Sequence, residues 1–216
     1  MGDLSGYGIR GYTTPDSDYE GRERSVIRTW TTSVEPTIEP LTLADLKNRL
    51  RVTECDDDAE LGQILTHARK QVEADSYRRL ITQTLVGYMD TFFDVREIEL
   101  RIAPVSSLTS ITYVDLAGAT QTFASTRYAA DIISTPPRVV LNTNETWELT
   151  EWNTPNAVAI TLVAGYGTTA ASVPAVAKLA IAEYAKGVWN GCEGATDTYR
   201  RLVSVLQWTA YHRVMT

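Results

Sequence analysis

The sequence predicts an α+β fold: a small helical bundle, made from an N-terminal helix pair and C-terminal helices, with an inserted antiparallel β-sandwich or barrel-like region. Two amphipathic helical patterns occupy residues 41–80, apolar residues then alternate over residues 81–167, and helical spacing returns after Pro174. These changes divide the chain into residues 1–39 (an extended N-terminal arm), 40–80 (the first part of the bundle), 81–167 (the inserted β domain) and 168–216 (the second part of the bundle and a C-terminal docking segment).

The composition narrows the class of protein. The chain has 216 residues, and its 44% hydrophobic content is enough for a sizeable core. A formal net charge of -7 counts against a free-standing DNA binder, because affinity for phosphate depends on clustered Lys and Arg. Cys55 and Cys192 are isolated, and we find no signal peptide and no apolar run of membrane-spanning length. These features indicate synthesis as a soluble protein in a reducing cytoplasm.

The N-terminal arm, residues 1–39, is rich in Gly and Tyr and shows no helical spacing. Two interpretations stay open. The arm is either an unordered tail, because Gly and acidic residues bury little apolar surface, or a segment that orders against a neighbouring subunit. The second interpretation assigns the contact to the apolar residues of the arm, Tyr7, Tyr12, Ile27 and Trp30.

The two helical patterns each present one narrow apolar stripe. Thr42 is placed to cap the first helix, and the second follows the acidic run Cys55 to Asp58. This run lacks the spacing of an EF-hand loop, so we interpret it as a helix N-terminus and expect no metal site. Four basic residues suit the opposite end of the second helix, where carbonyl groups accumulate negative charge: Arg69, Lys70, Arg78 and Arg79.

The alternating region predicts about seven short strands, with turns at Asp115–Gly118 and Thr135–Pro137. We expect Trp147 and Trp152, in an acidic loop, to pack onto the sheet. The expected strands are 85–93, 98–102, 110–115, 120–124, 128–133, 138–142 and 157–164.

The C-terminal third predicts two more helices. Gly165 and Gly167 lack the rest of a phosphate-binding fingerprint, so they are assigned to a turn that ends a strand. Pro174 then opens a helix to about residue 190, and residues 196–213 form another.

Four segments together resemble one family. They are LTLADLKNRLRV, VEADSYRRLITQT, APVSSLTSITYVDLAGATQTF and LVAGYGTTAASVPAVAKLAIAEYAKGVW, within about residues 40–190. They resemble the head-tail connector (adaptor) proteins of tailed phages, of the gp6-like and phiE125 gp8-like groups. The resemblance implies that the helices on both sides of the β region form one bundle. It also implies a ring of subunits, typically twelve, beneath the portal.

The resemblance implies a structural function in the virion, at the head-tail interface, after synthesis in the host cytoplasm. Such a ring extends the DNA channel and bridges the capsid to the neck or tail. Its expected partners are the portal protein, a head-closure or tail-terminator protein, other copies of the chain, and passing genomic DNA without sequence-specific binding. We expect the C-terminal segment to dock on the portal, and to be removable after Gly194 without unfolding. The candidate docking residues are Arg200, Arg201, Leu202, Trp208, Tyr211 and Arg213.

Functions of other classes remain as alternatives. A carbohydrate-binding or tail accessory module would use Trp147, Tyr113 or Tyr128 of the β domain as stacking platforms. A hydrolase would need a carboxylate pair, for which Asp57 and Asp58 are the best candidates, but no recognisable motif surrounds them. We therefore expect no enzymatic activity and no cofactor.

Overall fold

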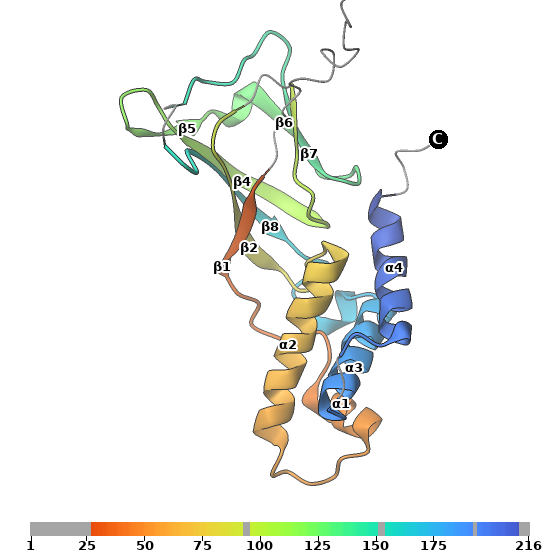
Figure 1. Cartoon of the computed structure of the whole chain (residues 1–216). Helices are drawn as coiled ribbons and strands as arrows, with labels where there is room; N and C mark the ends of the chain where they lie inside the picture. The colour runs from red at the N-terminus through yellow and green to blue at the C-terminus, as the bar shows by residue number, and fades with distance from the viewer. Residues whose placement is uncertain (1–26, 93–95, 151–153, 192–193, 212–216) are drawn as a thin grey trace, which may run out of the picture.

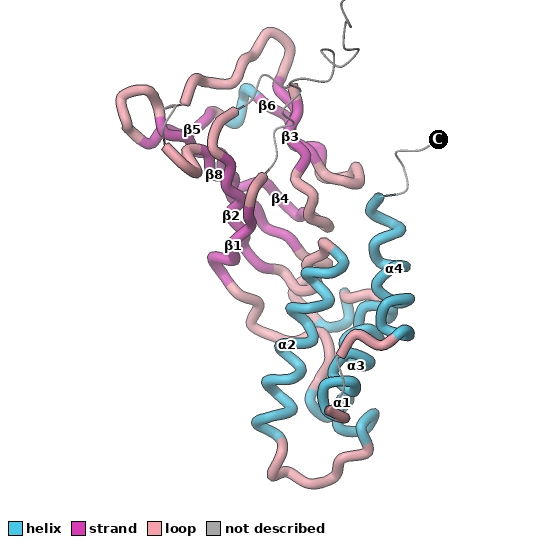
Figure 2. Tube along the Cα trace, viewed as in Figure 1, coloured by secondary structure: helices cyan, strands magenta, loops and turns pink. Residues whose placement is uncertain are grey.

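The computed structural model describes residues 27–92, 96–150, 154–191 and 194–211, with side chains up to Gln207. Helices gather at one end of the molecule and strands at the other (Figures 1 and 2). The elements are β1 Thr29–Val34, α1 Leu43–Leu50, α2 Asp58–Ser76, β2 Gln83–Met89, β3 Glu97–Glu99, β4 Val105–Val114, β5 Thr120–Phe123, β6 Tyr128–Asp131, β7 Arg138–Leu141, β8 Val158–Ala164, α3 Ala175–Trp189 and α4 Asp197–Tyr211, with short 3-10 turns η1 Ser125–Arg127 and η2 Ala170–Ser172.

The helical end is one bundle built from both sides of the β region. The hydroxyl of Thr42 accepts from the backbone N–H of Asp45 at 3.1 Å, which confirms the predicted N-cap of α1. The apolar stripes of α1 and α2 are covered by α3, in a single core that includes Leu46, Leu65 and Ile181. The helix after Pro174 therefore closes the bundle that the first two helices begin.

The β end consists of two antiparallel sheets, in the strand orders β1-β2-β8-β4-β5 and β3-β7-β6. A second apolar core lies with them and contains Leu85, Ile111, Val139 and Ile160. The five-stranded sheet is not closed into a barrel, so the barrel-like alternative does not hold. The α+β class and the antiparallel insertion are confirmed.

All seven expected strands are present, but some bounds differ. Strand β4 begins at Val105, five residues earlier than expected, and its pairing with β8 shifts twice, between Val105 and Ser107 and between Leu108 and Ser110. These irregularities break the alternation from which a strand is predicted. Strand β6 ends early because the carboxylate of Asp131 accepts from the backbone N–H and hydroxyl of Ser134 and forms a turn.

Strand β1 was not anticipated. It lies within the segment assigned to the arm, yet it pairs antiparallel with β2 of the same chain and forms the edge of the larger sheet. Ile27 and Trp30 pack against the β core. Trp30 lies over Gly87 so closely that a Cβ atom at position 87 would be 2.8 Å from its ring. A glycine inside β2 therefore makes room for the side chain that fixes β1.

Substituting Gly87 with Val is expected to displace Trp30 and to lower the free energy of unfolding by about 1–3 kcal/mol, the usual cost of overpacking. Urea titration followed by tryptophan fluorescence measures this loss. Gly62→Ala on α2 is the matched control, because an added Cβ there meets nothing within 4 Å. It should raise stability by about 0.5–1 kcal/mol, since Ala favours helix more than Gly does. Equal effects of the two substitutions would contradict the close packing at Gly87.

Candidate docking surfaces

Helix α4 is anchored to the bundle by buried side chains. Tyr199, Val203 and Leu206 belong to the helical core. The hydroxyl of Tyr199 donates to the carboxylate of Asp75 on α2 at 2.5 Å, and the Tyr199 ring contacts Tyr184 of α3. Burial, together with the carboxylate of Asp75, raises the pKa of Tyr199 well above its usual value. Tyr199 is therefore a neutral donor that joins three helices.

Polar contacts hold the same helix further along. The Arg78 guanidinium donates from Nε to the carbonyl of Leu206 at 3.0 Å and from Nη1 to the hydroxyl of Tyr166 at 2.7 Å. The side-chain amide of Gln207 donates to the carbonyl of Asp75. The side chain of Arg78, which the sequence assigned to the end of α2, thus serves α4 instead. This hydrogen bond ties the C-terminal end of α2 to the backbone of α4.

The outward face of α4 is the surface available to a partner. Arg200 and Arg201 are exposed, as is Val205, whose side chain is 53% accessible. Arg200 also pairs with Asp197 at 3.2 Å on the same helix. Leu202 is half-buried against the helical core, and its predicted contact with the portal stays a prediction. The side chains of Trp208 and Tyr211, and Arg213 entirely, lie outside the described residues.

The burial of α4 side chains in the helical core leads us to expect that cutting the chain after Gly194 destabilises the bundle, contrary to the prediction from the sequence. Such a truncation removes Tyr199, Val203 and Leu206, which are each at most 5% exposed, from the helical core. It would also leave Arg78 without its acceptor in α4. Substitutions on the outward face of α4 are the proper test of docking.

The residues predicted for the intersubunit arm divide into two groups. Ile27 and Trp30 contact the chain's own sheet, as described above, and are partly buried there. Tyr7 and Tyr12 lie outside the described residues. A contact of these four residues with a neighbouring subunit stays a prediction.

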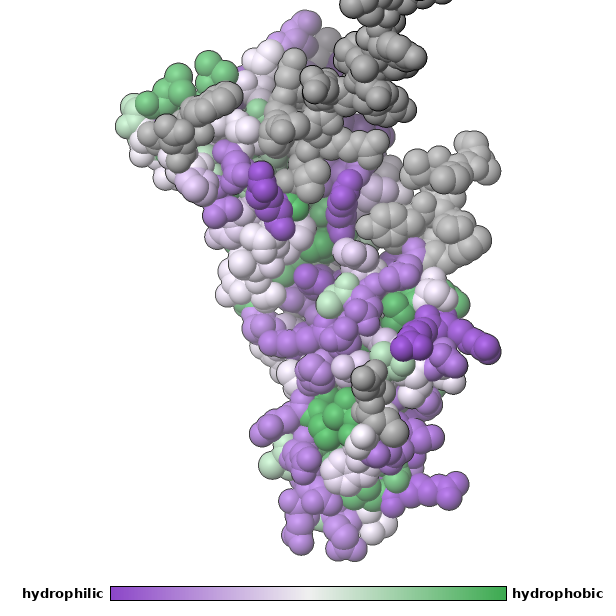
Figure 3. Space-filling view, in the orientation of Figure 1, coloured by the Kyte–Doolittle hydropathy of each residue, from purple (hydrophilic) through white to green (hydrophobic). Residues whose placement is uncertain are grey.

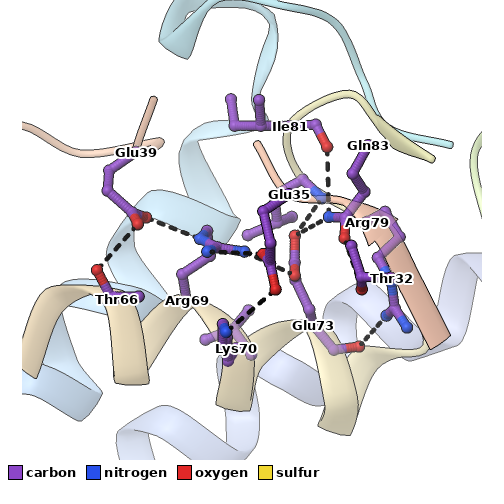
Figure 4. Close-up of polar contacts among 12 residues, drawn as sticks. Thr32, Glu35, Glu39, Thr66, Arg69, Lys70, Glu73, Arg79, Ile81 and Gln83 are labelled. Atoms are coloured by element: carbon purple, nitrogen blue, oxygen red, sulfur yellow. Dashed lines mark hydrogen bonds and ion pairs between the residues drawn. The ribbon is translucent and has the colours of Figure 1, made fainter. Parts of the chain in front are cut away.

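A network of charged side chains joins α2 to the segment that links β1 and α1 (Figure 4). The Arg69 guanidinium is only 3% exposed. It pairs with Glu39 of this linking segment at 2.8 Å and with Glu73, one helical turn along α2, at 3.1 Å. Lys70 pairs with Glu35 of the same segment at 3.2 Å. The linking segment is thereby held along α2.

Glu73 extends this network to the β end. Its carboxylate accepts from the backbone N–H of Leu80 at 2.8 Å and from the side-chain amide of Gln83 in β2 at 3.1 Å. Burial raises the pKa of Glu73, while the hydrogen bond from Leu80 and the charge of Arg69 oppose that change. The sequence analysis missed this network, although the spacing of Arg69 and Glu73 by four residues was a visible signal.

Another arginine holds the acidic loop of the β end. The Arg127 guanidinium pairs with Glu145 at 2.5 Å and with Glu148, donates to the carbonyl of Thr146, and lies over the Phe123 ring, 4.5 Å from its centroid. The loop contains no basic residue of its own, so this neutralising charge comes from a distant position.

The aromatic side chains of this loop and sheet form a packed cluster. The Trp147 ring stacks on Phe92, with centroids 4.8 Å apart, as expected for packing onto the sheet. Trp152 lies outside the described residues. Tyr113 and Tyr128 also contact Phe123. Because these rings contact one another, they do not offer the open stacking platform that a carbohydrate site needs.

Apolar side chains are exposed at the far end of the β region. Leu116, in the β4–β5 turn, is 66% accessible, and Leu149, in the acidic loop, is 74% accessible. Figure 3 shows apolar side chains gathered at the β4–β5 turn, at the end of the molecule opposite the bundle. This end and the outward face of α4 are the two candidate docking surfaces.

Two further observations concern the described part of the chain. It contains no group of three His, Cys, Asp or Glu side chains arranged to hold a metal ion. None of its helices is both long and apolar enough to cross a membrane.

The chain is similar to known proteins in its structure, but no match was found from its sequence. No family model matches the chain, and no curated protein matches its sequence. A chain in the neck of an empty gene transfer agent particle, computed with C6 symmetry, superposes with a TM-score of 0.70 at 21% identity, over 83% of this chain and 95% of that one.

The chain has the fold of a gene transfer agent neck protein. A chain in the virion of the native particle gives a TM-score of 0.69 at 20% identity, again over 83% and 95% of the two chains. A chain in the native neck, computed with C12 symmetry, gives 0.62 at 19% identity, over 83% and 94%. Because the match extends over nearly the whole of each neck-protein chain, it includes both the bundle and the β region. This fold agrees with the resemblance to head-tail connector proteins.

Proposed function

We propose that the chain is a structural protein of a phage-like virion: a head-tail connector that forms a ring in the neck, beneath the portal. The observation that carries the proposal is the superposition on neck proteins over 94–95% of their length. Support also comes from the two candidate docking surfaces, which lie at separate places on the fold, as a connector between two different partners would require.

The proposed ring has twelve subunits, in keeping with the C12 symmetry of a neck that contains a similar chain. In such a ring each subunit contacts its neighbours through two unlike faces, and the rotation between subunits must close. The N-terminal residues Tyr7 and Tyr12 are proposed to contact a neighbouring subunit. The remaining contacts between neighbouring subunits would then come from the sides of the bundle and of the β region.

In the proposed arrangement α4 docks on the portal. Its outward face combines two exposed arginines with exposed Val205, and arginine is enriched at protein interfaces because its planar guanidinium forms several directed hydrogen bonds. The buried face of α4 fixes the position of these groups on the bundle. The helix is thus a rigid platform rather than a tail.

The far end of the β region is proposed to contact the next neck or tail protein. Leu116 and Leu149 supply apolar contact area there, and Arg127 holds the loop that carries Leu149. The channel through the ring would carry DNA without binding its sequence. The net charge of -7 suits this conduit, because negative walls repel phosphate and leave DNA free to move.

Mixing the purified full chain with portal protein and imaging the complexes tests the ring. The expected result is added density of twelvefold symmetry at one end of the portal. Portal particles without added density, at concentrations where both proteins are folded, would contradict the proposal.

Reversing the charge of Arg200 and Arg201 together, to Glu, is expected to weaken binding to the portal at least tenfold, because like charges across an interface oppose association. Binding is measured by co-sedimentation with portal at several salt concentrations. The matched control is Arg49→Glu with Arg51→Glu, which makes the same charge change at two exposed positions, one in the last turn of α1 and one at its C-cap. If both double variants lose binding equally, the effect reflects net charge and α4 is not the docking surface.

A further inference from the structure

The outer edge of β1 has no partner strand among the described residues. Strand β1 pairs with β2 on one side, and no other described strand pairs with it on the other side. Its sequence, TWTTSV, carries no charge and no proline, and all of its residues except Trp30 are exposed. Natural sheets usually protect an edge strand with charged residues or proline, because its free N–H and C=O groups can pair with a strand of another molecule.

The register of β1 has an internal symmetry. Thr29, Trp30, Thr31, Thr32 and Val34 oppose five consecutive residues of β2, from Tyr88 to Thr84, and Ser33 is left out of the ladder as a bulge. Thr31 is therefore the central ladder position. Because Ser33 is excluded, Thr29 and Val34 lie two ladder positions from Thr31 on either side.

This symmetry places one positive and one negative side chain at equal numbers of ladder positions from Thr31, on opposite sides of it. Arg28 is the next residue beyond Thr29, and Glu35 is the next beyond Val34. If two β1 edges pair antiparallel about an axis through Thr31, with Ser33 left out of the new ladder as it is in the pairing with β2, Arg28 of each copy faces Glu35 of the other. Both side chains are accessible, at 67% and 54%, although each also has partners within its own chain: Asp90 for Arg28, and Lys70 and Arg69 for Glu35.

We propose that the free chain forms a two-fold dimer through antiparallel pairing of its β1 edges. The occupant of the edge is a second copy, because the charges at the two ends of β1 are complementary to themselves on two-fold rotation. Across the new ladder Thr31 would face Thr31 of the second copy and Thr29 would face its Val34, and such pairs of β-branched residues stabilise antiparallel strands.

The dimer goes beyond the proposed function and does not depend on it. A two-fold pair has no place in a cyclic ring, so the dimer would have to separate before a copy entered the ring. Pairing through β1 therefore keeps the free chain from closing rings on its own, and it covers an edge that otherwise promotes aggregation.

Sedimentation of the full free chain over a range of concentrations tests the dimer. A small contact of this kind predicts a dissociation constant on the order of 10–100 µM. Arg28→Glu alone and Glu35→Arg alone should each weaken dimerisation roughly tenfold, since each change acts twice across the axis. The double variant should restore it. An effect that acted through Asp90, Lys70 or Arg69 of the same chain would not be restored by the double variant.

Cross-linking locates the contact. In a Cys55→Ser, Cys192→Ser background, Thr31→Cys places two thiols at the axis, so a short bis-maleimide should join the copies in high yield. Thr122→Cys, an exposed threonine on the opposite edge strand β5, is the matched control and should give little product. A chain that stays monomeric at all concentrations, or equal cross-linking from the two cysteines, would overturn the proposal.

Discussion

Replacing Arg69 with Met is expected to lower the free energy of unfolding by about 3–5 kcal/mol, the usual cost of removing one partner from a buried ion pair. Arg69 is 3% exposed and pairs with both Glu39 and Glu73. Met keeps most of the aliphatic packing but removes the cation that pairs directly with the buried carboxylate of Glu73, leaving only the weaker effect of the Arg79 charge. Chemical denaturation of the purified chain measures the loss. Lys70→Met, at the exposed neighbouring ion pair with Glu35, should cost less than about 1 kcal/mol.

A second substitution and a pH series identify the cause of the stability loss in Arg69→Met. Arg69→Met with Glu73→Gln should recover more than half of the loss, because the amide oxygen still accepts from Leu80 without a charge. Burial already raises the pKa of Glu73, and removing Arg69 should raise it further. Glu73 then contributes stability that is complete below its unfolded pKa and is lost as the pH rises through the folded value. The defect of Arg69→Met should therefore be smallest in acid, and a defect independent of pH would point to lost packing instead.

Replacing Tyr199 with Ala is expected to lower the free energy of unfolding by a similar amount, about 3–5 kcal/mol, as for other large aromatic side chains removed from a core. The side chain is 2% exposed, contacts Tyr184 and donates to Asp75. Both the cavity and the loss of the hydrogen bond to Asp75 Oδ2 add to the cost. Thermal and urea unfolding of the variant measure it.

Val205→Ala is the matched control on the same helix. Because Val205 is 53% exposed, its loss should change stability by no more than about 0.5 kcal/mol. A Tyr199→Ala variant as stable as the wild type would mean that α4 is not part of the bundle. In that case α4 would be a separable docking segment after all.

Local patterns were sufficient for most of the secondary structure. The cap at Thr42, the helix after Pro174 and the hairpin turn at Asp115–Gly118 each rest on chemistry confined to a few neighbouring residues, and each is present. The carboxylate of Asp115, for example, accepts from the backbone N–H groups of Ala117 and Ala119. The full length of β4 was missed because its irregular pairing with β8 breaks the alternation.

The candidate docking surfaces were only partly predictable. Helical spacing and charge selected α4, but its outward face could be defined only once Tyr199, Val203 and Leu206 were known to be buried. The pairing of Arg127 with Glu145 and Glu148 joins residues about twenty positions apart across an aromatic cluster. Such contacts have no local spacing rule.

The sequence by itself determined the α+β class, the helical bundle interrupted by an antiparallel insertion, and most of the elements, because caps, turns and apolar periodicity act between near neighbours. Only the tertiary structure decided that the end of the expected arm is strand β1, that Trp30 covers Gly87, and that Arg69 and Arg78 bind partners in other segments. These outcomes depend on which surfaces meet after the chain has folded. The hydrogen-bonding groups and charges of a short segment do not specify their distant partners.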